Sequence, residues 1–197
     1  IPRRLVGSEM CIRDRFRTVR WHYHPEYEIH LVNATSGTFY IGDFVGRFQP
    51  GQLIMTGPNL PQNWISDIQP DEIVPIRSLV IQFPEPFIEN ACATMPEMEA
   101  LRPLLDRSRR GVLFDDETTR LVRPLMDRLV EAQGIRRLAL FWEILDHLAN
   151  APQSEVLASL GFGLDLGRVH DGGINRALTY LREHLTEQIE ELSLIHI

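Results

Sequence analysis

Two histidines and a glutamate stand at short spacing in the segment WHYHPEYEIH, residues 21–30. His22 and His24 are two residues apart, and Glu28 follows four residues later. Side chains two apart on a β-strand point to the same face, so both imidazoles can point into one barrel. Two neutral imidazoles and one carboxylate are ligands that suit iron, manganese or zinc. The segment therefore predicts either a metal site or the polar lining of a binding pocket.

Short β-strands are the elements that would position these side chains. Residues 26–83 consist of aromatic and β-branched runs separated by turn residues such as Gly37 and the pair Gly42-Asp43. Many short strands with frequent turns are typical of a sandwich or a small barrel. We therefore predict a small antiparallel β-barrel over this part of the chain.

The apolar period becomes helical from about Pro96. Helices are predicted over residues 96–108 and 115–132, the second kinked or divided at Pro124. The strongest pattern covers residues 134–150, where apolar side chains recur at alternating spacings of three and four. These side chains are Ile135, Leu138, Trp142, Leu145 and Ala149. A last helix is predicted after a loop rich in Gly and Ser, so the fold class is α+β.

Composition excludes several classes of protein. The apolar fraction of 44% supports a core, and no window reaches the roughly 18 apolar residues of a membrane-spanning helix. The two cysteines, Cys11 and Cys92, form no Cys-x-x-Cys pair, and no secretory leader is apparent. We therefore expect a cytoplasmic protein with no membrane partner.

The charge is unevenly distributed along the chain. All 20 basic residues are arginines, and six of them fall in the first 20 residues. The remaining residues hold 14 arginines against 25 acidic side chains, a net charge of −11. Such an acidic surface repels the phosphate backbone, so this part of the protein should bind nucleic acid poorly.

Both ends of the chain differ from the sequence beside them. Residues 6–15, VGSEMCIRDR, and 192–197, LSLIHI, follow no helical or strand period. Both resemble translated sequencing-adapter read-through. We expect residues 1–15 and 191–197 to be non-native and the natural protein to extend beyond both ends.

The histidine segment and a later segment together resemble the two motifs of the cupin superfamily. His22-x-His24-x-x-x-Glu28 with Gly37 resembles the first, and residues 46–64, GRFQPGQLIMTGPNLPQNW, resemble the second. The second motif supplies one more histidine ligand, and the resemblance places that ligand at Gln62. An amide is a weaker ligand than imidazole, which counts against tight metal binding, so we expect no cofactor. Any metal would bind His22, His24, Glu28 and Gln62.

The order of the short motifs over residues 16–190 resembles the sensor half of AraC-type transcription regulators. After the cupin-like segments come LVIQFP (79–84), RSRRGVLF (107–114) and RRLALFWEILDHLA (136–149). The resemblance implies a cupin-like jelly-roll barrel over 16–90 and a helical dimerisation region over 91–152. It further implies a linker over 153–172 and the first helix of a truncated helix-turn-helix DNA-binding domain over 173–190.

The resemblance also implies a bacterial regulator that senses a small-molecule effector and has no enzymatic activity. DNA would be bound only through the missing C-terminal domain. The residues expected to contact the effector come from both cupin-like motifs and the strand between them. They are Trp21, His22, His24, Glu28, Tyr40, Gln62 and Trp64.

The apolar stripe at 135–149 allows two interpretations. It can pack onto the barrel, or it can form an antiparallel contact in a homodimer, as the resemblance implies. The residues expected in that contact are Leu138, Trp142, Leu145 and Ala149.

Two alternatives remain open for the function. A metal-dependent cupin enzyme, such as a dioxygenase or isomerase, would use His22, His24 and Glu28. A protein that only binds a ligand, without a DNA partner, would end naturally near residue 190.

Overall fold

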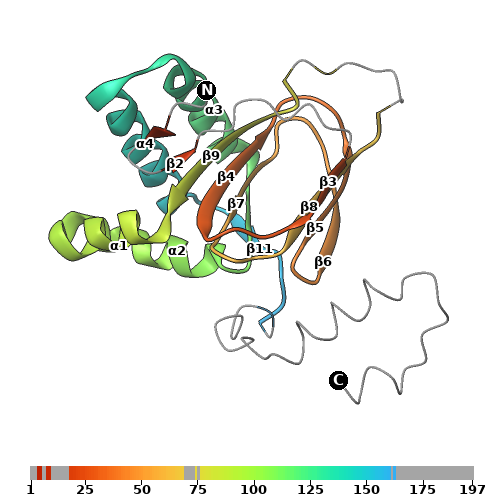
Figure 1. Cartoon of the computed structure of the whole chain (residues 1–197), viewed down its shortest axis with the longest axis horizontal. Coiled ribbons are helices and arrows are strands. Elements are labelled where there is room, and N and C mark those ends of the chain that lie inside the picture. Colours follow the sequence, from red (N-terminus) through yellow and green to blue (C-terminus); the bar gives the residue numbers. More distant parts are fainter. Residues whose placement is uncertain are drawn as a thin grey trace. The chain divides into compact units, whose positions relative to one another are not determined.

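The structure, a computed structural model, describes residues 4–5, 8–9, 18–68, 74, 76–160 and 162 (Figure 1). All of them belong to one compact unit, Ile1–Gly163. The helix expected over 173–190 and the expected non-native end at 191–197 lie outside the described residues.

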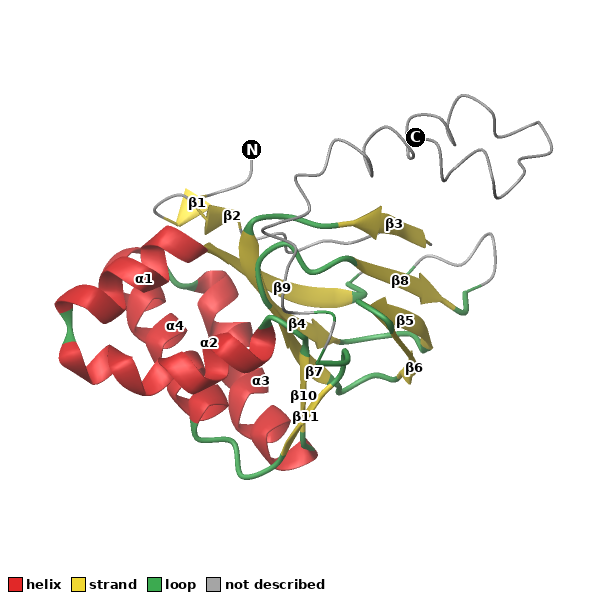
Figure 2. Ribbon diagram, turned by 90° about the horizontal axis from the view of Figure 1, so that it is seen from below, coloured by secondary structure: helices red, strands yellow, loops and turns green. Residues whose placement is uncertain are grey.

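Two antiparallel sheets form the barrel (Figure 2). The four-stranded sheet has the order β3-β8-β5-β6 and the five-stranded sheet the order β11-β10-β7-β4-β9. The first consists of β3 (Thr18–His22), β8 (Gln62–Ser66), β5 (Gly37–Ile41) and β6 (Phe44–Phe48). The second consists of β11 (Ser154–Val156), β10 (Val112–Phe114), β7 (Leu53–Thr56), β4 (Glu26–Val32) and β9 (Ser78–Pro84). A separate short pair joins β1 (Arg4–Leu5) and β2 (Ser8–Glu9).

Strand β4 shows how the period-2 pattern divides the core into two parts. Tyr27, Ile29 and Leu31 belong to an apolar cluster shared with the helices. Val32 belongs to a second cluster, whose other members come from both sheets and therefore fill the barrel interior. Because strand side chains alternate, Glu28 and His30 point inward with Val32.

The helices cover the outer face of the five-stranded sheet (Figures 1 and 2). They are α1 (Glu85–Thr94), the 3-10 helix η1 (Pro96–Leu101), α2 (Arg102–Ser108), α3 (Asp116–Glu131) and α4 (Gly134–Ala149). The Asp115 carboxylate caps α3 by accepting a hydrogen bond from the Thr118 amide at 2.7 Å. The structure thus confirms the expected α+β class, an antiparallel barrel with helices.

Four details differ from the sequence-based expectations. Helix α1 begins inside the region expected to be barrel. Strand β10 lies in the region expected to be helical, and β11 lies in the expected linker, yet both belong to the five-stranded sheet. Both strands have only three residues, too few to show an alternating pattern. Helix α3 is not divided at Pro124: it runs continuously through this residue, which lies on its exposed side, while the opposite side is buried.

Helix α4 packs its apolar stripe against the chain itself. Leu145 is completely buried in the cluster shared with the five-stranded sheet, so its expected role in a subunit contact is wrong. Leu138, Trp142 and Ala149 are partly buried beside that cluster. The Trp142 ring stacks on Phe87 of α1 with centroids 5.7 Å apart. For the three partly buried residues, the subunit contact stays a prediction.

Candidate functional site

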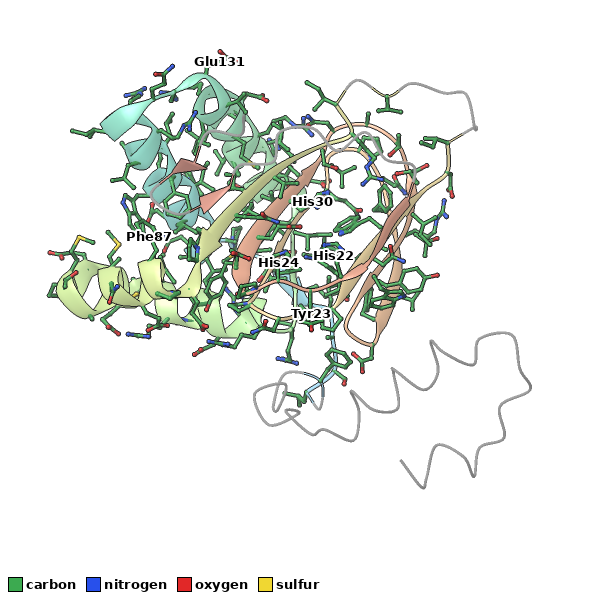
Figure 3. The ribbon with its side chains drawn as sticks, in the orientation of Figure 1. His22, Tyr23, His24, His30, Phe87 and Glu131 are labelled. Atoms are coloured by element: carbon green, nitrogen blue, oxygen red, sulfur yellow. The ribbon has the colours of Figure 1, made fainter. Side chains whose placement is uncertain are left out.

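The Glu28 carboxylate is the centre of a polar cluster inside the barrel. It is 5% exposed and accepts a hydrogen bond from Gln82 Nε2 at 2.8 Å. His24 Nε2 lies 3.2 Å from Oε2 of Glu28, and His30 Nδ1 lies 3.4 Å from Oε1. Figure 3 shows His24 and His30 in the space between the two sheets. Both carboxylate oxygens therefore have partners.

These contacts determine the charge of Glu28. Burial alone would raise the pKa of this carboxyl group. Hydrogen bonds from His24, His30 and Gln82 outweigh burial and hold the pKa well below its usual range. Glu28 is therefore an ionised carboxylate in the barrel interior, stabilised by three donors from β9, β4 and the β3–β4 connection.

His24 connects this carboxylate to the four-stranded sheet. Its Nδ1 lies 3.4 Å from a carboxylate oxygen of Glu26, and its Nε2 lies 3.3 Å from Nε2 of Gln62 on β8. The His22 ring stacks beside it with centroids 5.9 Å apart. Burial lowers the pKa of His24, but the neighbouring Glu28 and Glu26 carboxylates outweigh burial and raise that pKa above its usual value.

His30 extends the cluster to β9 and to the aromatic interior. Its Nε2 lies 2.8 Å from Oγ of Ser78, so a neutral ring with hydrogen on Nδ1 can donate to Glu28 and accept from the serine. The same ring stacks on Trp64 with centroids 4.1 Å apart and planes 18° apart. Trp64 also contacts Phe39 and Phe48. The orientation of Trp64 is therefore fixed from several sides.

Besides Nδ1 of His24, which lies 3.4 Å from the Glu26 carboxylate without a hydrogen bond, three inward-facing polar groups have no hydrogen-bond partner among the described residues. They are Oγ1 of Thr56, Oε1 of Gln62 and Nε1 of Trp64. Thr56 lies directly opposite Glu28 in the β4–β7 pair, and Gln62 and Trp64 share the inner face of β8. An unpaired buried polar group costs about 1–3 kcal/mol of stability, and most buried polar groups in proteins have a partner. Three such groups in one barrel interior therefore call for an explanation.

The structure brings five of the seven predicted effector contacts together. His22, His24, Glu28, Gln62 and Trp64 form or adjoin the interior cluster. These placements do not test whether an effector binds there, and that role stays a prediction.

Trp21 and Tyr40 lie elsewhere. Their rings contact each other with centroids 5.6 Å apart, and Trp21 is 54% exposed. Tyr40 alternates with Phe39 and Ile41, which belong to the barrel interior, so it points to the outer face of the four-stranded sheet. The structure therefore does not place these two residues with the interior cluster, and their expected contact with an effector stays a prediction.

Four members of the cluster were not predicted as site residues: His30, Ser78, Gln82 and Thr56. The alternation of Glu26, Glu28 and His30 was a usable signal, but Pro25 makes the strand phase hard to assign from sequence alone. Gln82 and Thr56 lie directly opposite Glu28 on its two neighbouring strands. Only the strand register shows that these two side chains lie beside Glu28.

The side chains at the expected metal positions do not fit a metal site. Gln82 and His30 already occupy the two oxygens of Glu28. Among the residues that the structure describes, no group of three or more His, Cys, Asp or Glu side chains is arranged to hold a metal ion. The interior instead offers a carboxylate that accepts three hydrogen bonds, beside unpaired hydrogen-bonding groups.

Comparison with known structures gives distant matches. The AraC-like transcriptional activator CuxR is 9% identical, with a TM-score of 0.43, over 87% of this chain and 55% of that chain. An apo variant of ToxT from Vibrio cholerae is 10% identical, with a TM-score of 0.44, over 95% of this chain and 68% of that chain. The chain thus spans about half the length of the first structure. HEPD from Streptomyces albus, with 2-hydroxyethylphosphonate and Fe(II) bound, is 13% identical with a TM-score of 0.28, over 71% of this chain and 38% of that chain.

Sequence comparison identifies the family. No match was found among curated proteins. In the described part of the chain, no helix is long and apolar enough to cross a membrane. A family model described as the AraC-like ligand binding domain matches residues 6–150, well over half of the chain. The chain therefore belongs to the family of AraC-like ligand binding domains.

Proposed function

We propose that the barrel binds a small-molecule effector and that the chain is the sensing part of a bacterial AraC-type, DNA-binding transcription regulator. The observation that carries the proposal is the interior cluster, in which Thr56, Gln62 and Trp64 present unpaired polar groups beside the ionised Glu28. Such groups reduce stability, and a ligand that pairs with them would recover that loss. Family membership supports the same assignment.

The proposal assigns no catalytic role to the cluster. A metal-dependent enzyme would need Glu28 as a free ligand, whereas its oxygens accept hydrogen bonds from His24, His30 and Gln82. The effector would act by binding two conformations of the protein with different affinity. DNA contacts belong, in this proposal, to a domain outside the described residues.

A screen of small molecules by thermal denaturation tests the effector site. A ligand present at 100 times its Kd should stabilise the chain by about 2.7 kcal/mol, which is a measurable rise in Tm. We expect Gln62→Leu to abolish that rise for true effectors. The matched control is Gln52→Leu, a half-buried glutamine in the turn before β7, which should leave the rise unchanged. Stabilisation that survives Gln62→Leu would contradict an interior site.

We further propose that α4 contributes to a homodimer. Its side chains Leu138, Trp142 and Ala149 are only partly buried in the chain, and Ile135 is 86% exposed. A second copy could cover this apolar surface.

Sedimentation of the chain at several concentrations tests the dimer. We expect Leu138→Arg to shift the equilibrium to monomer at concentrations where the parent is dimeric, because a charge would be buried in the contact. Val45→Arg on β6 is the matched control, since this apolar side chain is 59% exposed and lies on the four-stranded sheet, which the helices do not cover. A parent that remains monomeric at high concentration would refute the proposal.

A further inference from the structure

The three unpaired groups inside the barrel limit which ligand atoms could pair with them. Gln62, Thr56 and Trp64 are 1%, 2% and 3% exposed, so none of them can bond to bulk water. Each lies on a strand that also contributes to the polar cluster or to the apolar interior. A ligand in this interior must therefore complement their hydrogen-bonding chemistry.

Trp64 can only donate. The indole Nε1–H has no acceptor among the described residues. Its ring is held between His30 at 4.1 Å and Phe39 at 5.2 Å, with the edge of Phe48 at 5.4 Å. The ring cannot turn to find an acceptor without disrupting these stacks.

Thr56 also has a hydrogen atom to donate. The Glu28 carboxylate opposite it would be the natural acceptor, but its oxygens take hydrogen bonds from His24, His30 and Gln82. The Thr56 hydroxyl remains without a partner among the described residues.

The amide of Gln62 presents a third donor. Because the Glu28 carboxylate only accepts, Nε2 of His24, 3.2 Å away, must carry a hydrogen. That nitrogen cannot accept from Nε2 of Gln62 at 3.3 Å, since both atoms would be donors. Rotating the amide by half a turn places its oxygen against His24 and leaves its NH₂ group unpaired, the arrangement that satisfies His24.

We propose that the effector carries a hydrogen-bond-accepting oxygen, a carboxylate or a carbonyl, that is bound by Thr56, Gln62 and Trp64. The inference rests on the proposed function and specifies the class of ligand for that site. A cationic amine is disfavoured, because Thr56, Gln62 and Trp64 present hydrogen atoms to it and no acceptor, and Glu28 already accepts hydrogen bonds from three side chains. The apolar side chains that surround the cluster would contact the rest of the ligand.

Probes that share one apolar body and differ in the polar group test the class. Benzoate and benzamide offer acceptor oxygens, whereas benzylamine offers only donors at neutral pH. The chain has three tryptophans, so its indole N–H signals are assignable in a ¹⁵N-labelled sample with Trp21→Phe and Trp142→Phe variants. We expect benzoate or benzamide to move the Trp64 N–H signal downfield, because a hydrogen bond forms there, and benzylamine to leave it in place.

A matched pair of threonine variants separates ligand contact from general stability. Thr56→Val removes an unpaired buried hydroxyl from the interior cluster, and Thr119→Val removes another from α3. Both should raise the denaturation midpoint, because an unpaired hydroxyl is replaced by an apolar group of the same shape. Only Thr56→Val should weaken binding of the acceptor probe, by about fivefold.

Three results would overturn the inference. If benzylamine moved the Trp64 signal as strongly as benzoate, the proposed ligand class would be wrong. The proposal of an effector site inside the barrel would still stand. Failure of every probe to move that signal would refute the acceptor-oxygen class, and the screen with Gln62→Leu would still decide the effector site independently. A lower midpoint for Thr56→Val would show that its hydroxyl is already paired, for example by buried water, so that it is not available to a ligand.

Discussion

Replacing Glu28 with alanine should lower the free energy of unfolding by about 3–5 kcal/mol, the range for removing one partner of a buried charged pair. The carboxylate is 5% exposed and serves as acceptor for His24, His30 and Gln82. Its removal leaves these three side chains with unpaired polar hydrogens in the barrel interior. Because small domains are stable by only about 5–15 kcal/mol, the loss would be a large fraction of the total.

Urea denaturation followed by circular dichroism would measure this loss. The matched control is Glu26→Ala on the same strand, whose side chain is 31% exposed and contacts His24 at 3.4 Å. A partly exposed ion pair contributes about 0–1 kcal/mol, so this control should change stability little. Equal losses for the two variants would contradict the central role of Glu28.

The barrel was largely predictable from the sequence, whereas the inward-facing side of β4 shows clearly only once the structure gives the strand phase. Alternation of Tyr27, Ile29 and Leu31 with Glu28 and His30 reflects two environments, the helix-covered face and the interior. Such a pattern follows from strand geometry alone and needs no information about distant residues. The barrel prediction was confirmed for this reason.

The membership of the cluster was harder to predict because it depends on register. Thr56 and Gln82 meet Glu28 only because β4 lies between β7 and β9 in one particular alignment. A shift of one residue would turn each strand's side chains to the other face. No local pattern in LIMT or SLVIQF specifies that alignment.

The outward position of Trp21 has a local cause. The register of β3 against β8 shifts between Val19 and His22, so simple alternation does not hold along this strand. Trp21 consequently contacts Tyr40 on the outer face, whereas His22 lies opposite Gln62. A bulge of this kind has no clear signature in a single sequence.

A second large loss of stability is expected in the apolar cluster between the helices and the five-stranded sheet. Leu145→Ala on α4 should lower the free energy of unfolding by about 2–5 kcal/mol, because it leaves a cavity in a close-packed cluster. Leu145 is 0% exposed, and the same cluster contains Phe83 of β9 and Phe141. Chemical denaturation would measure the loss against Ile135→Ala on the same helix, which is 86% exposed and should change stability by at most about 0.5 kcal/mol.

The concentration dependence of this effect distinguishes a core residue from an interface residue. If Leu145 packs within one chain, the stability lost in Leu145→Ala should be the same at about 1 µM and about 100 µM protein, since no association step is involved. If the side chain instead stabilised a subunit contact, the loss would grow with protein concentration, because only the associated parent would benefit from the contact. A constant loss therefore supports packing of α4 on the barrel, and it restricts any dimer contact of this helix to side chains such as Leu138 and Trp142, which are only partly buried.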